Sequence, residues 1–200
     1  METTIKITTF ILTIVYFLVA FVIPTYRTWK MTGIAPVTFS NSDNAHDYIG
    51  KIFKILLVLL FITVTAFAFS EVIYTYFSPI IFLQRIEIQY IGLFLLVISL
   101  IWIVVAQAQM STSWRIGIDE KHKTRLVTEG VFSISRNPIF LGMIVTLLGL
   151  FLILPNALTF CILVTGFIVI QIQVRLEEEF LLKQHGNDYT HYQSKTKRFL

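Results

Sequence analysis

The apolar stretch "IFLGMIVTLLGLFLILPNALTFCILVTGFIVIQI", residues 139–172, decides the fold of this chain. It holds two apolar runs, 139–154 and 157–172, which only Pro155 and Asn156 separate. A helix that crosses the core of a bilayer needs about 20 apolar residues, and both runs come close to that length. The stretch therefore predicts two antiparallel membrane helices that are joined by a tight turn.

Three further apolar runs cover residues 5–23, 52–69 and 90–106, and the second can continue to about residue 77. The chain is 56% hydrophobic and has a mean hydropathy of +0.75. A soluble domain of 200 residues cannot bury that much apolar surface. The first run lacks a basic leader and a cleavage site, so we expect it to stay in the protein. The sequence predicts an all-α integral membrane protein with about five transmembrane helices.

We expect one membrane domain over residues 1–200. Its first two predicted helices lie within residues 1–77, and its functional core spans residues 90–200. Two polar segments of that core, the loop 111–137 and the tail 173–200, are long enough to build a site.

The distribution of basic residues predicts the orientation of the bundle. All Lys and Arg residues except Lys6 and Arg85 fall in segments that lie on one side if the chain crosses the membrane five times. Basic residues favour the cytoplasmic side, so the C-terminus is predicted to be cytoplasmic. Membrane topology thus explains the positive charge, and we expect no nucleic-acid partner. We also expect no metal site, because Cys161 is the single cysteine and the four histidines are scattered.

The start of the fourth predicted helix, "SRNPIF" at residues 135–140, is the first candidate site. Asn137 suits an N-cap and Pro138 suits the first helical position. The free N–H groups and the dipole of a helix start attract anions, and Arg136 adds further donors. The alternative is an ordinary helix start beside an arginine that reaches lipid headgroups.

The loop and the tail contribute further candidates. Leu126 and Val127 are apolar residues in a charged loop, and they either cover a ring of a ligand or anchor the loop in the bundle. Glu177 and Glu178 follow the last membrane helix directly, where carboxylates are costly unless cations pair with them. The alternative is a solvated helix surface, on which Arg175 pairs with a nearby glutamate.

Taken together, "LVTEGVFSISRNPIFLG", a helical hairpin and "RLEEEFLLKQHGNDYTHY" resemble the isoprenylcysteine carboxyl methyltransferase family, whose wider group includes phospholipid N-methyltransferases. The resemblance covers the chain from Trp114 onwards. It implies that S-adenosylmethionine is bound at the cytoplasmic end of the bundle, in a pocket that the C-terminal helix caps. By position it implies cofactor contacts from Leu126, Val127, Phe132, Asn137, Pro138, Ile139, Phe140 and Glu177.

The candidate catalytic residues are Arg175, Glu178 and Arg136. Arg175 or Arg136 can orient a carboxylate acceptor, and Glu178 is the candidate base for an amine acceptor. Asn137 stands where the family has histidine, so a role that needs a titrating imidazole is lost. Phe132 and Phe140 replace tyrosines of the family pattern, which weakens the match to a prenylcysteine substrate more than the match to the cofactor.

We therefore expect methyl transfer from S-adenosylmethionine to a lipid-like acceptor in the membrane, first of all a prenylcysteine-like carboxylate. One alternative is an NADPH-dependent sterol or enone reductase, in which Lys121, Lys123 and Arg125 would contact the additional phosphate of NADPH. A second alternative is a non-catalytic membrane scaffold of the same fold. The compact size and the lack of a retention signal favour a bacterial inner membrane.

Overall fold

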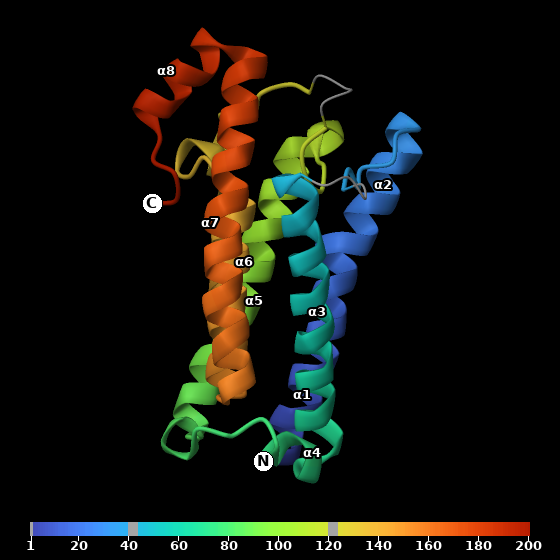
Figure 1. Cartoon of the computed structure of the whole chain (residues 1–200), viewed down its shortest axis with the longest axis vertical. Coiled ribbons are helices and arrows are strands. Elements are labelled where there is room, and N and C mark those ends of the chain that lie inside the picture. Colours follow the sequence, from blue (N-terminus) through green and yellow to red (C-terminus); the bar gives the residue numbers. More distant parts are fainter. Residues whose placement is uncertain (1, 40–43, 120–123) are drawn as a thin grey trace.

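Long apolar helices run side by side along the long axis of the molecule (Figure 1). This computed structural model describes residues 2–39, 44–119 and 124–200, and these residues form helices and no β-strand. Among these described residues, four helical stretches are long and apolar enough to cross a membrane, and α6 is a shorter apolar helix. The elements are α1 (Glu2–Phe17), the π-helical turn η1 (Leu18–Val22), α2 (Ile23–Thr32), α3 (Ala45–Phe69), α4 (Glu71–Thr75), η2 (Ile81–Leu83), α5 (Ile86–Met110), η3 (Ser111–Ser113), η4 (Gly130–Ser133), α6 (Pro138–Ile153), α7 (Ala157–His185) and α8 (Asn187–Lys195). The prediction of an all-α membrane protein is confirmed.

The sequence suggested that the first helix ends before Pro24. In the structure it continues through η1 and α2 to Thr32. Proline has no N–H group, so the carbonyl of Ala20, four residues earlier, loses its usual helical donor. The side chain of Gln107 on α5 supplies the missing bond, with its Nε2 atom 2.7 Å from that carbonyl oxygen. The π-helical turn and this donor from another helix let the proline stay inside a continuous helix.

The second membrane helix, α3, ends at Phe69, and the suggested continuation to residue 77 is wrong. Ser70 adopts an extended conformation, and its hydroxyl accepts a hydrogen bond from the N–H of Ile73 at 3.3 Å. This cap starts the separate short helix α4.

The hairpin between α6 and α7 is confirmed. Asn156 is fully buried between the two helices, and its side chain accepts a hydrogen bond from the N–H of Thr159 at 2.9 Å. The Thr159 hydroxyl bonds back to the Asn156 N–H at 3.2 Å, which completes a capping box. The start of α7 is therefore fixed against the end of α6.

Small residues bring α5 and α6 close together. A Cβ atom added at Gly92 would lie 2.5 Å from the carbonyl oxygen of Gly149, and one added at Gly142 would lie 2.5 Å from a side-chain carbon of Ile103. The hydroxyls of Ser99 and Thr146 lie 2.8 Å apart across the same interface. Close backbone approach and hydroxyl bonds are typical of packing between membrane helices.

Different segments form the two ends of the bundle (Figure 1). The N-terminus, α4 and the turn between α6 and α7 lie at one end, whereas α2, η4, the start of α6 and α8 lie at the other. Both predicted polar segments therefore meet at one end. Which end faces the cytoplasm stays a prediction.

Candidate functional site

The start of α6 is held in place by its neighbours. Pro138 occupies the first turn as predicted, and its carbonyl accepts a hydrogen bond from the Trp102 indole at 2.9 Å. Asn137 stands at the N-cap position, yet its side chain does not cap the helix. Its Nδ2 atom donates instead to Glu178 Oε1 on α7 at 3.1 Å and to the carbonyl of Arg198 at 3.2 Å. The side chain of Asn137, which we expected to cap α6, thus connects the start of α6 to α7 and to the tail.

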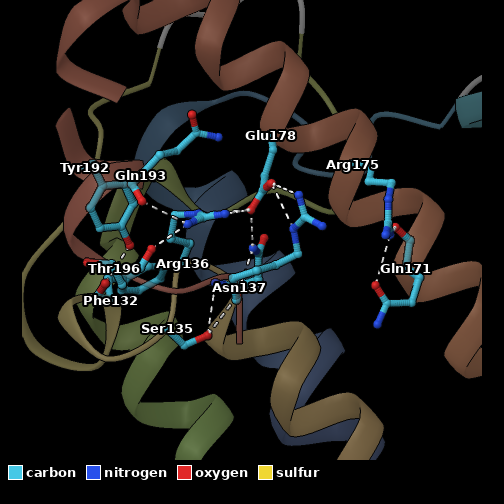
Figure 2. A network of polar contacts seen from close by, with 11 residues as sticks. Phe132, Ser135, Arg136, Asn137, Gln171, Arg175, Glu178, Tyr192, Gln193 and Thr196 are labelled. Carbon is cyan, nitrogen blue, oxygen red and sulfur yellow. Dashed lines mark hydrogen bonds and ion pairs between the residues drawn. The ribbon is translucent and has the colours of Figure 1, made fainter. Parts of the chain in front are cut away.

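Glu178 is at the centre of a charged network (Figure 2). Its side chain is buried, and its Oε1 atom lies 3.1 Å from Arg136 Nε and 3.0 Å from Arg136 Nη2. Its Oε2 atom accepts hydrogen bonds from Arg198 Nε at 3.0 Å and Arg198 Nη2 at 2.7 Å. A buried carboxylate is tolerated when charged donors satisfy it, and here two guanidinium groups and an amide do so. We call Arg136, Asn137, Glu178 and Arg198 the Glu178 cluster.

The residues before α6 also form hydrogen bonds with the C-terminal tail. The Nη1 atom of Arg136 donates to the carbonyls of Gln193 and Thr196, and its backbone N–H donates to the carbonyl of Lys197 at 3.0 Å. The Ser135 hydroxyl lies 3.3 Å from the carbonyl of Arg198. Backbone groups of the tail thus bind the residues just before α6, so the tail covers the start of that helix.

Two tyrosines of α8 are buried beneath this tail. The Tyr192 hydroxyl donates to the carbonyl of Phe132 in η4 at 2.6 Å, and the rings of Tyr189 and Tyr192 pack edge to face. Burial raises the pKa of Tyr192 to about 12, and the negative charge of Glu178 adds to this rise. The Tyr192 hydrogen bond fixes α8 against η4, and the Tyr189 ring packs on Tyr192.

Glu177 and Gln173 form a second polar pair on α7. Gln173 is buried, and its Nε2 atom donates to Glu177 Oε1 at 2.8 Å. The Oε1 atom of Gln173 is buried and has no hydrogen-bond partner within the part of the chain that the structure describes. Across residues 2–39, 44–119 and 124–200, no lysine or arginine forms an ion pair with Glu177. The pair therefore presents acceptors that suit a cation.

Arg175 lies apart from the Glu178 cluster (Figure 2). It is exposed, and its Nη1 atom donates to the carbonyl and the side-chain oxygen of Gln171, at 2.6 and 3.0 Å. Two residues along an α-helix turn by about 200°, so Arg175 projects from the face of α7 opposite Gln173 and Glu177. Its predicted role in holding an acceptor stays a prediction, and this geometry does not support it.

The remaining predicted cofactor residues lie in the loop before α6 and in its first turn. Phe132 and Pro138 are buried, and Leu126, Val127, Ile139 and Phe140 are partly buried. The loop before α6 turns at Gly130, where φ is +63°. Gln109 on α5 fixes this turn by accepting the N–H of Val131 at 3.0 Å. The predicted contacts of these residues with a cofactor stay predictions.

Sequence reasoning missed Arg198. We read its side chain only as part of the positive charge that orients the bundle, although it neutralises Glu178. The hydrogen bond to Glu178 raises the pKa of Arg198 above its usual value. The available signal was the acid pair itself, since a buried carboxylate at a membrane edge is costly unless cations pair with it.

Comparison with known proteins finds a match to a protein family. The family model described as phospholipid methyltransferase matches residues 88–188, half of the chain. The matched segment contains every predicted site residue but not Arg198. A search of curated proteins gave no match.

Proposed function

Because the chain belongs to the phospholipid methyltransferase family, we propose that it transfers a methyl group from S-adenosylmethionine to a lipid-like acceptor in the membrane. The site would lie at the end of the bundle where the start of α6, the loop 124–137 and the tail meet. The observation that carries this proposal is the meeting of Asn137, Glu178 and Arg198 there, next to the polar pair of Gln173 and Glu177.

The residues present fit this cofactor. S-adenosylmethionine carries a cationic ammonium, and its sulfonium supplies an electrophilic methyl group. The Oε1 atom of Gln173, which has no partner among the described residues, and the carboxylate of Glu177 are acceptors suited to such a cation. We propose that this pair holds the ammonium, and that Leu126, Val127 and Phe132 provide apolar contacts for the adenine ring.

The Glu178 cluster would act by positioning. Both oxygens of Glu178 already accept hydrogen bonds from charged donors, which lowers its ability to take a proton. We therefore assign Glu178 and Arg136 to holding the tail, α6 and α7 in one arrangement. Positioning of this kind can provide much of the rate of an in-line displacement.

This arrangement favours a carboxylate acceptor, as in a prenylcysteine, because a carboxylate is already ionised and needs no general base. An aminophospholipid is the second candidate. It is favoured by the family description and by Glu177, whose carboxylate has only Gln173 as a partner among the described residues. Family membership favours methyl transfer over the reductase and scaffold alternatives. Of the basic residues considered for NADPH, Lys121 and Lys123 lie outside the described residues.

The test is a tritiated-methyl assay with the full chain in lipid nanodiscs. Prenylcysteine, fatty acid and aminophospholipid acceptors are offered in parallel, and base treatment separates the classes, because methyl esters release volatile methanol and N-methyl groups do not. We expect base-labile product and a loss of more than tenfold in Glu177→Gln. The neighbouring variant Glu179→Gln, which removes an exposed carboxylate paired with Lys183, serves as the matched control. No methyl transfer to any acceptor, combined with NADPH oxidation in the presence of a sterol, would overturn the proposal.

The proposed location is a cell membrane that the protein crosses several times, with the site at the cytoplasmic face and a bacterial inner membrane as the host. Cysteine accessibility labelling in intact cells tests this orientation. A cysteine placed at Lys195 should be protected from a membrane-impermeant reagent, whereas one placed at the exposed Tyr76 should react. The reverse pattern would contradict it.

A further inference from the structure

A cavity of about 620 Å³ lies at the end of the bundle opposite the Glu178 cluster. Its lining comes from α1, α3, α4, η2, the start of α5 and the turn between α6 and α7, which gather at that end in Figure 1. Cavities of about 300–1,000 Å³ hold small-molecule ligands. The methyl transfer proposed above does not use this cavity.

The Tyr74 hydroxyl is the strongest indication of a ligand. Tyr74 is 6% exposed, lines the cavity and packs against Phe67, with the two ring centres 5.2 Å apart. Its hydroxyl lies near the side chains of Gln84 and Asn156, yet it is buried without a hydrogen-bond partner of normal geometry among the described residues. Because a buried hydroxyl without a partner costs free energy, a ligand group that bonds to it is favoured.

The other polar groups of the lining both donate and accept hydrogen bonds. Glu71 is exposed and forms no ion pair with a lysine or arginine in the part of the chain that the structure describes. Gln89 donates through Nε2 to the carbonyl of Ile153 at 3.1 Å, which leaves its Oε1 atom as an acceptor. The amide of Gln84 adds a donor and an acceptor. An ammonium group only donates and a carboxylate only accepts, whereas a hydroxyl group does both and therefore suits this lining.

The charges of the lining favour a neutral ligand. Lys6 and Glu71 contribute one charge of each sign. Lys6 already has interactions within the protein, including one with the Phe67 ring at 5.9 Å, so we assign it no contact with a ligand. The carboxylate of Glu71 disfavours an anion, and the ammonium of Lys6 disfavours a second cation in the same cavity.

We propose that this cavity binds a neutral, hydroxyl-rich group of the size of one sugar ring. Its hydroxyls bond to Tyr74, Glu71 and Gln89, and its C–H groups pack on apolar lining residues such as Pro79 and Ile86. A few polar groups that orient a ligand within a partly apolar lining are typical of small-molecule sites. The sugar ring is either free or the headgroup of a glycolipid, and the experiment separates these two sources.

The test uses the full chain in a detergent without sugar groups, with binding followed by native mass spectrometry and by the shift in unfolding temperature. Glucosyl diacylglycerol is compared with diacylglycerol, which lacks the sugar, and with glucuronosyl and glucosaminyl diacylglycerol, whose sugars carry a negative and a positive charge. We expect the neutral glycolipid to bind at least about fivefold more tightly than each of the others. Methyl glucoside identifies the source: an affinity equal to that of the glycolipid indicates a sugar from solution, and a lower affinity indicates a glycolipid.

Matched variants locate the binding site. Tyr74→Phe removes a hydroxyl that has no partner among the described residues, so it should keep the unfolding temperature of the free protein and weaken binding about fivefold. Glu71→Ala should weaken binding by a similar factor. The controls are Tyr76→Phe, at a tyrosine that is 80% exposed, and Glu87→Ala, at an exposed acid outside the lining, and each should change binding less than about twofold. Binding should persist in Glu177→Gln, which separates this cavity from the proposed methyl-transfer site.

Two results would overturn the proposal. Equal or tighter binding of diacylglycerol or of either charged glycolipid would show that the cavity does not select a neutral sugar. Equal losses in Tyr74→Phe and Tyr76→Phe, or no loss in either variant, would place the binding outside this cavity.

Discussion

Arg198 follows Glu178 by 20 residues, yet its guanidinium donates two hydrogen bonds to one oxygen of that carboxylate, at 3.0 and 2.7 Å. The bonds join α7 to the end of the tail, while Arg136 and Asn137 join the other oxygen to the start of α6. One buried carboxylate thus connects three segments. Four predictions follow from this network and from the other polar contacts of the bundle.

Replacing Arg198 by Gln should release the tail. The variant removes two charged donors from Glu178, and because Arg198 is partly exposed we expect a loss of about 1–2 kcal/mol in the free energy of unfolding. Hydrogen exchange should accelerate in residues 189–198, and methyl transfer should fall more than tenfold. Lys197→Gln is the matched control, since only the backbone carbonyl of Lys197 binds Arg136. An unchanged rate of hydrogen exchange in the tail of the Arg198→Gln variant would contradict the proposed attachment of the tail through Arg198.

Replacing Glu178 by Gln should lower the free energy of unfolding more than replacing its neighbour Glu179 by Gln. Glu178→Gln leaves two guanidinium groups without their carboxylate in a buried place, and we expect about 2–4 kcal/mol of destabilisation. Glu179→Gln removes an exposed charge and should leave the chemical unfolding midpoint unchanged. The two unfolding curves are compared in the same detergent. Equal midpoints for the two variants would refute the central role of Glu178.

The Gln107 side chain should contribute to stability only because residue 24 is a proline. Gln107→Leu leaves the Ala20 carbonyl without a donor, at a cost of about 1–2 kcal/mol. Pro24→Ala restores an N–H group at that position, so Gln107→Leu should then cost less than about 0.5 kcal/mol. A double-mutant cycle measures this coupling. Gln109→Leu, which removes a bond to Val131 instead, should show no coupling with Pro24→Ala.

Tyr192 should make the protein sensitive to alkaline pH. Burial raises its pKa from 10.0 to about 12, so the folded state favours the protonated hydroxyl. This contribution to stability is complete below pH 10 and is lost as the pH rises to about 12. The free energy of unfolding, measured at several pH values between 9 and 12, should therefore fall.

The variant Tyr192→Phe should show a smaller slope over this range. It should also be less stable at neutral pH by about 1 kcal/mol, since the Phe132 carbonyl loses its donor. Tyr48→Phe, which alters a tyrosine that is 65% exposed, should behave like the original protein. A slope for Tyr192→Phe equal to that of the original protein would show that other groups cause the alkaline loss.

The sequence predicted the elements whose signals are local. Pro155 and Asn156 interrupt an apolar run, and both the proline and the capping asparagine act within a few residues of their position. The same holds for Pro138 at the start of α6. These residues can be read from one sequence because their bonding partners are close in the chain, whereas the predicted cap Asn137 bonds to the distant Glu178 instead.

The unpredicted features depend on partners that are distant in sequence. Nothing near Pro24 shows that Gln107 will supply the donor the helix lacks. Likewise, the return of the tail to Glu178 depends on the turn at Gly186 and on the burial of Tyr189. The predicted site residues divide accordingly. Arg136, Asn137 and Glu178 meet, whereas Arg175 lies apart from them and bonds to Gln171 one turn earlier on the same helix.

Because α7 is one unbroken helix, its length limits the insertions and deletions that the chain can tolerate. The capping box at Asn156 fixes the rotation of this helix at one end. Glu178 lies about 30 Å further along the helix axis and must meet Arg136 there. One residue inserted between them would swing the carboxylate by about 100° and move it by about 1.5 Å along the axis. Insertions and deletions in this interval should therefore be far more harmful than exchanges of one apolar residue for another.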